Sequence, residues 1–155
     1  MSGQQNVTAL EAPLRIVVPV DGSAPANRAV AHALSLVAGR PESEIVLVNA
    51  QNLQTLDISD ISAVMTVEVD RQLAARQSQT APRRAITLCR KAQARFVARA
   101  ELGSPAETID RVAREVGAYQ IVMGTRGLGS LGNLFLGSVA TKVVRLAQAP
   151  LTLVK

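Results

Sequence analysis

The feature that most constrains the fold is an alternation of short, β-branched apolar runs with longer stretches of helical periodicity. RIVVPV (Arg15–Val20) and EIVLVNA (Glu44–Ala50) are typical of strands buried on both faces of a parallel sheet. Turn residues follow such runs, and then apolar residues recur three and four positions apart. This order predicts a doubly wound α/β domain, in which a parallel sheet carries helices on both faces. The five predicted strands are residues 15–20, 44–50, 95–102, 119–123 and 151–155.

Local signals mark the starts of the predicted helices. Ser23 is placed to cap a helix that has Pro25 in its first turn. Residues 104–107 read S-P-A-E, a capping box that starts a second helix. Pro82 lies inside a helical pattern and is expected to kink or break it. A last helix is predicted over residues 138–148.

Composition narrows the class of protein. Aromatic residues make up 2% of the chain, so aliphatic side chains and alanine must fill the core, and the rings on which single-stranded nucleic acid stacks are scarce. The single cysteine, Cys89, excludes an internal disulfide and is interpreted as a small buried hydrophobe. No leader peptide or membrane-length apolar run is recognisable, which predicts a cytoplasmic protein. Residues 1–13 are predicted to be a flexible tail and residues 14–155 a single domain.

The basic residues are concentrated in two regions. Eight of them lie between Arg71 and Arg99 and are interpreted as the solvated face of a helix rather than as a nucleic-acid-binding stripe. After Glu115 the chain has no acidic residue, and the basic residues there favour the binding of an anion. These basic residues are Arg126, Lys142, Arg145 and Lys155.

Half of the glycines lie in one stretch, GTRGLGSLGNLFLGS (residues 124–138). It contains G-x-G-x-x-G, but several residues separate this motif from the preceding strand, and no acidic residue follows that could bind a ribose. The dinucleotide-binding fingerprint is therefore excluded. Gly127 and Gly132 have the spacing of a Walker loop, but Asn133 and Leu134 stand where that loop requires lysine and a hydroxyl.

The spacing that remains is G-x2-G-x9-G-S, formed by Gly124, Gly127, Gly137 and Ser138. Glycine at the first two positions permits close approach of the backbone to a ligand, with positive φ allowed. Gly137 and Ser138 open the last helix, where unpaired N–H groups and the helix dipole favour a phosphate chain. Residues 128–136 would then form a flap over the phosphates.

This motif resembles the ATP-binding motif of the universal stress protein family. The likeness extends to RIVVPVDGS, EIVLVNA, ELGSPAETI and the last strand and helix, and so covers the chain apart from the tail and residues 51–93. The resemblance implies a Rossmann-like fold of the adenine nucleotide alpha hydrolase type, with ATP as ligand and Mg²⁺ or Mn²⁺ held mainly by its phosphates. It also implies a homodimer formed by antiparallel pairing of the final strands, Leu151–Lys155.

The resemblance also assigns the site residues. The ends of the first two strands would line the adenine, with Asp21 near the ribose and the main chain of Ala50 at the base. The end of the fourth strand and the first two motif glycines would flank the base, ribose and α-phosphate, and the start of the last helix would hold the β- and γ-phosphates. Arg126 stands where the family often has histidine and is placed to meet a phosphate directly. The residues assigned in this way are Pro19, Val20, Asp21, Ala50, Met123, Gly124, Arg126, Gly127, Gly137, Ser138 and Val139.

No catalytic set is recognisable in the sequence. Paired carboxylates and Cys–His or Ser–His–Asp arrangements are missing, and the single histidine, His32, is interpreted as a structural or surface residue. The sequence favours an ATP-binding regulatory module that acts on a protein partner. Two alternatives stay open, a nucleotide-free scaffold of the same fold and a slow metal-dependent ATPase. Asp21 could also be a turn residue that accepts from local N–H groups, and Ser138 an ordinary helix cap.

Overall fold

The computed structural model describes residues 13–52, 82–127 and 136–155. Within these ranges the chain forms a five-stranded parallel sheet in the order β3-β2-β1-β4-β5, which confirms the predicted α/β fold. The described strands are β1 (Arg15–Pro19), β2 (Glu44–Gln51), β3 (Arg95–Leu102), β4 (Gln120–Gly124) and β5 (Leu151–Val154). The described helices are α1 (Ala24–Val37), α3 (Arg83–Lys91), α4 (Pro105–Glu115) and α5 (Ser138–Leu146).

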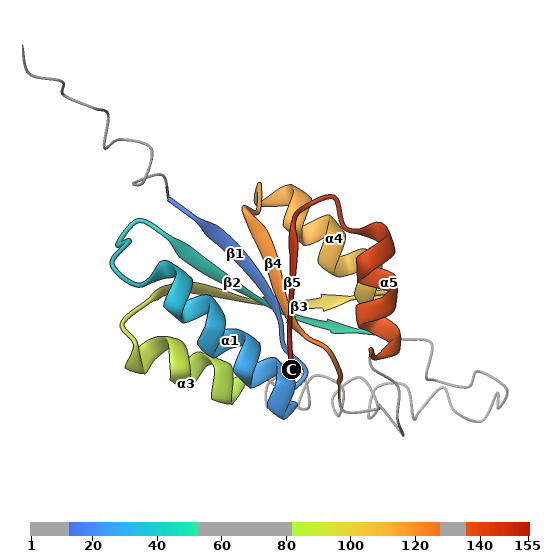
Figure 1. The fold of residues 1–155 in the computed structure, drawn as a ribbon, viewed down its shortest axis with the longest axis horizontal. Coiled ribbons are helices and arrows are strands. Elements are labelled where there is room, and N and C mark those ends of the chain that lie inside the picture. The colour runs from blue at the N-terminus through green and yellow to red at the C-terminus, as the bar shows by residue number, and fades with distance from the viewer. Residues whose placement is uncertain (1–12, 53–81, 128–135) are drawn as a thin grey trace, which may run out of the picture.

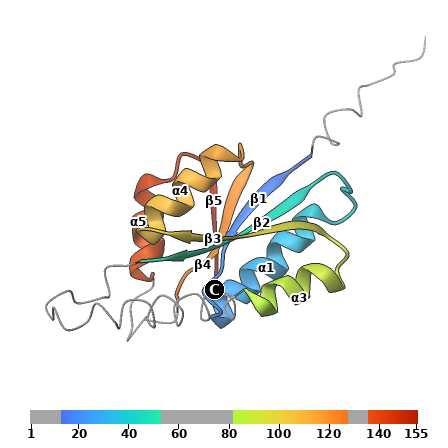
Figure 2. The ribbon, with the colours of Figure 1, turned by 180° about the vertical axis from the view of Figure 1, so that it is seen from behind.

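The sheet forms a central layer between two pairs of helices. Helices α1 and α3 cover one face, and α4 and α5 cover the other (Figures 1 and 2). Two apolar clusters correspond to these faces. Ile16 and Val18 of β1 pack on the α1–α3 side, whereas Val17 packs on the α4–α5 side. Both faces of β1 are therefore buried, which is why its sequence is a continuous β-branched run.

Ion pairs to a helix cover one of the two edge strands, β3. The sequence of β3 alternates in polarity over its first half, which predicts a strand near an edge, and the sheet order confirms this. A closed ring of four ion pairs joins Arg99 and Glu101 of β3 to Arg111 and Glu115 of α4, with N–O distances of 2.6 to 3.0 Å. The ring ties the edge strand to the helix layer above it.

The helix boundaries confirm some of the expected signals and correct others. Ser23 caps α1, and its Oγ accepts from the Ala26 N–H at 3.2 Å. Ser104 is the N-cap of α4, but its side chain makes no capping hydrogen bond, so the predicted capping box is wrong in that respect. Its main-chain oxygen accepts the first hydrogen bond of the helix, from the Thr108 N–H, as the carbonyl of an N-cap residue does in any case. Pro82 precedes the first residue of α3, so the described helix starts after the proline, while residues 53–81 lie outside the described part of the chain.

Candidate functional site

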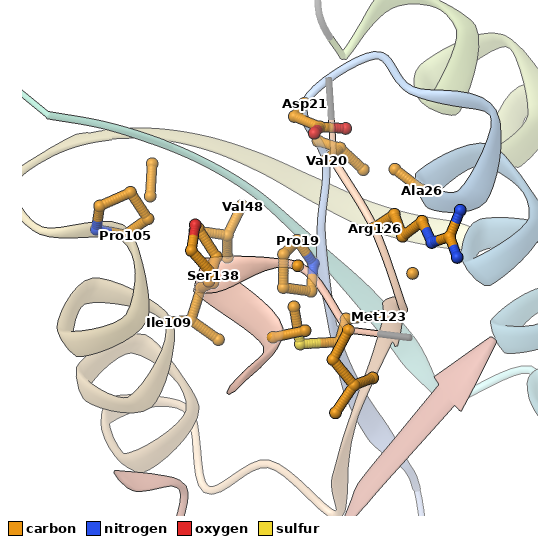
Figure 3. A pocket seen from close by; sticks show the side chains of 17 residues that line it. Pro19, Val20, Asp21, Ala26, Val48, Pro105, Ile109, Met123, Arg126 and Ser138 are labelled. Carbon is orange, nitrogen blue, oxygen red and sulfur yellow. The ribbon is translucent and has the colours of Figure 1, made fainter. Parts of the chain in front are cut away.

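A cavity of about 580 Å³ opens at the carboxyl end of the sheet, where β1 and β4 lie side by side. The strand order reverses at this point, and doubly wound folds bind ligands at such a switch. All the residues assigned to the site from the sequence line this cavity (Figure 3). They are Pro19, Val20, Asp21, Ala50, Met123, Gly124, Arg126, Gly127, Gly137, Ser138 and Val139.

One wall of the cavity is apolar and is continuous with the core beneath α4 and α5. Val48, Ile109 and Met123 belong to that core cluster and also line the cavity. Val48 and Pro105 are not among the residues predicted from the sequence, although two signals could have found them. Val48 shares a strand face with Ala50, and Pro105 follows the third strand closely. Ile109 lies in the apolar stripe of α4, and nothing in that stripe separates a cavity residue from a core residue. The other lining residues that were not predicted are Ala26, Leu136 and Ala140.

The N-terminus of α5 also lines the cavity. The Gly137 N–H donates to the Thr125 carbonyl oxygen at 2.7 Å, which joins the helix start to the segment after β4. The next three residues, Ser138, Val139 and Ala140, all line the cavity. Their N–H groups belong to the first turn, where no intrahelical acceptor exists, because the first such bond runs from Thr141 to Gly137. The arrangement provides main-chain donors and a positive helix end for an anion.

Close packing explains the glycine at position 124, and positive φ explains none of the three motif glycines. Positive φ values occur at other described glycines, but not at Gly124, Gly127 or Gly137. A Cβ on Gly124 would lie 2.7 Å from the Cβ of Pro25 and 3.0 Å from the main-chain nitrogen of Ala26. The end of β4 therefore packs directly on the first turn of α1, and this contact requires glycine at position 124.

Asp21 connects the two loops that meet at the switch point. One carboxylate oxygen accepts from the Ser23 N–H at 2.9 Å, which is the turn role considered for this residue. The other oxygen faces the glycine loop, since a Cβ on Gly127 would lie 2.5 Å from it. Asp21 also lines the cavity, so the turn role and a position at the ligand are compatible.

Arg126 is exposed and is directed away from the N-terminus of α5. Figure 3 shows its side chain pointing toward α1, on the far side of the loop from Ser138. In this conformation the guanidinium does not lie where the N–H groups of α5 converge. The expectation that Arg126 meets a phosphate at that point requires a different rotamer.

Asn49 and Cys89 lie in the interior of the protein and do not line the cavity. Asn49 is 5% exposed, and its Nδ2 donates to the Val20 carbonyl oxygen at 2.9 Å, which holds the end of β1 beside β2. Cys89 is fully buried in α3, as expected, and burial raises the pKa of its thiol to about 11.

His32 is exposed on α1. Of the basic residues between Arg71 and Arg99, those on α3 are exposed, as expected for a solvated helix face.

Charged side chains are few at the cavity. Asp21 and Arg126 are the charged residues among the described residues that line it. In the described ranges, no three His, Cys, Asp or Glu side chains come together as a metal site. A divalent ion held at the described part of the cavity would need ligands from a bound molecule, and phosphate oxygens are suitable ligands for Mg²⁺. None of the described helices is long and apolar enough to cross a bilayer.

Comparison with known families identifies the class of protein. The universal stress protein family matches residues 14–155, and the chain belongs to this family. A universal stress protein of Methanocaldococcus jannaschii is 28% identical over 144 residues, which cover 91% of this chain and 81% of that protein. One of Thermus aquaticus is 55% identical over 53 residues, which cover 34% of this chain and only 39% of that protein.

Solved structures share the fold. The universal stress protein UspA from Lactobacillus plantarum superposes with a TM-score of 0.78 at 19% identity, covering 93% of this chain and 99% of that one. A family member from Arabidopsis thaliana with AMP bound has a TM-score of 0.66 at 20% identity, covering 92% of each chain. One from Archaeoglobus fulgidus in complex with dAMP has a TM-score of 0.60 at 23% identity, covering 94% of this chain and 99% of that one. Some structural relatives of this chain thus bind adenine nucleotides.

Proposed function

We propose that this protein binds ATP in the cavity at the carboxyl ends of β1 and β4. The observation that carries the proposal is the placement of an apolar wall and a helix N-terminus at the same cavity. Its volume, about 580 Å³, lies within the range usual for small-molecule sites. Val48, Ile109 and Met123 provide the apolar contacts that a purine needs, and the first turn of α5 provides donors for phosphates. The relatives with AMP and dAMP support adenine as the base.

The protein would act as a nucleotide-dependent regulatory module, with Mg²⁺ or Mn²⁺ carried by the phosphates. Asp21 has one oxygen in a turn and faces the glycine loop with the other, so it is placed for the ribose and not as a free catalytic base. Catalysis is therefore not part of the proposal. The predicted flap, residues 128–136, lies outside the described residues except for Leu136, which lines the cavity.

The proposal is tested first on the protein as purified. Any nucleotide released on denaturation is identified by chromatography, and ATP, AMP, adenosine and NAD are then titrated calorimetrically into the stripped protein. ATP should bind more tightly than adenosine, because its phosphates reach the N-terminus of α5. If none of the four binds at millimolar concentration, the fold serves as a nucleotide-free scaffold and the proposal is wrong. Metal-dependent release of phosphate from ATP would instead support the ATPase alternative.

A matched pair of variants separates the main-chain donors from the Ser138 hydroxyl. Ser138→Ala removes only the hydroxyl, whereas Ser138→Pro also removes one N–H. Proline is suited to this first helical position, where the N–H has no partner within the helix. The preceding residue, Gly137, already has the extended conformation that proline requires of its neighbour, with ψ of 164°.

Loss of a donor to a charged phosphate should weaken ATP binding in Ser138→Pro by about tenfold or more. Ser138→Ala should lose less, and adenosine should bind both variants as it binds the unaltered protein. Far-UV circular dichroism checks that α5 is retained. Equal ATP affinities for the unaltered protein and Ser138→Pro would show that the helix N-terminus does not hold the phosphates.

A homodimer through Leu151–Lys155 is part of the same proposal. Strand β5 is an edge strand, and the carbonyl oxygens of Pro150 and Val154 face β4. Because main-chain groups alternate sides along a strand, those of Leu151 and Leu153 face away from β4, where no other described strand lies, and could pair with a second copy. Sedimentation equilibrium of the unaltered protein should give twice the chain mass. A monomer at high micromolar concentration would contradict the dimer.

A further inference from the structure

A second, smaller cavity lies next to the nucleotide cavity, between the first turn of α1 and the end of β5. Its volume is about 300 Å³. It is lined by Pro25, Arg28, Thr125, Arg126 and Lys155. Three of these five residues are cationic, and none of the described residues that line the cavity is acidic. The side chains that carry these charges come from α1, from the loop after β4 and from the residue after β5.

The position of one cation is set by the fold. The Nε of Arg28 donates to the main-chain oxygen of Lys155, which fixes the guanidinium beside the end of β5. The Arg126 side chain is directed toward the same region, away from Ser138 (Figure 3). Arginine is the residue best suited to bind an oxyanion, because its planar donors match tetrahedral phosphate.

We propose that this second cavity binds a free phosphate ion through Arg28, Arg126 and Lys155, at a site separate from the nucleotide cavity. Arg126 is the residue that the two cavities share, since it lines both. The residues on either side of Arg126 contact parts of the nucleotide cavity. The Thr125 carbonyl oxygen accepts from the Gly137 N–H at the start of α5, and Gly127 lies against Asp21. An ion that holds Arg126 in the second cavity therefore withholds this guanidinium from a nucleotide.

This last step rests on the proposed function and predicts antagonism between phosphate and ATP. Antagonism of this kind is reciprocal, so ATP that recruits Arg126 weakens phosphate binding by the same factor. Adenosine carries no phosphate and has no use for Arg126, so its affinity should not depend on the second cavity.

Phosphate binding is measured first, on stripped protein, with inorganic phosphate as the probe and potassium chloride keeping the ionic strength constant. Saturable binding is expected, and Arg28→Gln and Lys155→Gln should each weaken it by about tenfold. Arg90→Gln is the matched control, because Arg90 is an exposed arginine on α3 that lines neither cavity. Phosphate should still bind when AMP is present at saturation. Phosphate binding that is unchanged in Arg28→Gln and Lys155→Gln would overturn the proposal, and the titrations of these two variants are made without any nucleotide.

The affinity for ATP is then measured with and without phosphate. Phosphate should weaken ATP binding in the unaltered protein, and the effect should be much smaller in Arg28→Gln. If phosphate weakens ATP equally in both proteins, it competes at the N-terminus of α5 and the second site is refuted. If Arg28→Gln weakens ATP but has no effect on inorganic phosphate, the cavity takes a distal phosphate of the nucleotide, and the separate site is likewise refuted.

Discussion

Replacing Gly124 with alanine tests the contact that closes the carboxyl end of β4 against α1. The new Cβ would lie 2.7 Å from the Cβ of Pro25, 2.8 Å from its carbonyl carbon and 3.0 Å from the Ala26 nitrogen. Non-bonded carbon atoms prefer separations of about 3.5 to 4.0 Å. Because two of these three neighbours are main-chain atoms, they cannot rotate away, and relief requires movement of the helix start.

The size of the effect follows from the cost of overpacking. An extra methyl group in a tightly packed site costs about 1 to 3 kcal/mol. A domain of this length loses roughly 2 to 4 °C of melting temperature per kcal/mol, so the expected decrease is roughly 2 to 12 °C. Gly137→Ala is the matched control within the same motif. Its Cβ would meet no atom closer than 3.5 Å, and the change of helix cap costs about 1 kcal/mol or less.

The assay is urea and thermal unfolding of both variants, followed by ATP titration. Gly124→Ala should be the less stable of the two, and it should also bind ATP more weakly because the displaced helix start adjoins Asp21. If Gly124→Ala unfolds at the same urea concentration as the unaltered protein, then β4 and α1 are not packed as tightly as the distances indicate.

Three further predictions concern other parts of the fold. Hydrogen bonds from arginine partners lower the pKa values of Glu101 and Glu115. Since the folded-state pKa lies below the unfolded value of about 4.3, their stabilisation is present above that pH and is lost as the pH falls through the folded pKa. The urea midpoint should therefore fall less steeply on acidification in Glu101→Gln than in the unaltered protein, and parallel curves would contradict this. The Cys89 thiol is buried with a raised pKa of about 11, so iodoacetamide should label it near neutral pH only after unfolding, as mass spectrometry would show. Asp110→Ala removes the acceptor of the Gln148 N–H and should cost about 1 to 3 kcal/mol in urea unfolding, whereas an unchanged midpoint would mean that water replaces it.

The sheet could be predicted because its signals are local. The β-branched run at Ile16–Val18 identifies a strand with two buried faces, and the mixed polarity of β3 identifies an edge. The Ser23 cap and the turn at Asp21 are also short-range features, and both form as expected. Helix ends were less predictable. Ser104 is the N-cap of α4 but makes no side-chain capping bond, because such a bond depends on how the preceding turn orients the side chain.

The motif spacing named several of the residues that line the cavity, whereas packing alone brings in the others. Gly124 and Gly137 both line the cavity, but the reason for glycine at 124 is its contact with Pro25, about a hundred residues earlier. In the sequence, Ile109 cannot be distinguished from the core residues of α4. It lines the cavity because of where it lies along α4 relative to the carboxyl ends of the strands. The direction of Arg126 likewise depends on neighbours that are distant in sequence.

The sequence by itself determined the order and type of the elements, the glycine spacing and the family, because each depends on residues a few positions apart. Only the tertiary structure decided which of those elements meet. The parallel sheet brings the carboxyl ends of β1, β2 and β4 together and sets the start of α5 against them. One cavity is therefore lined both by apolar side chains and by main-chain N–H donors. The tertiary structure also brings Arg28, Arg126 and Lys155 to a second cavity. These contacts join residues about a hundred positions apart, and no local pattern encodes them, since they follow from strand order and from the close packing of buried side chains.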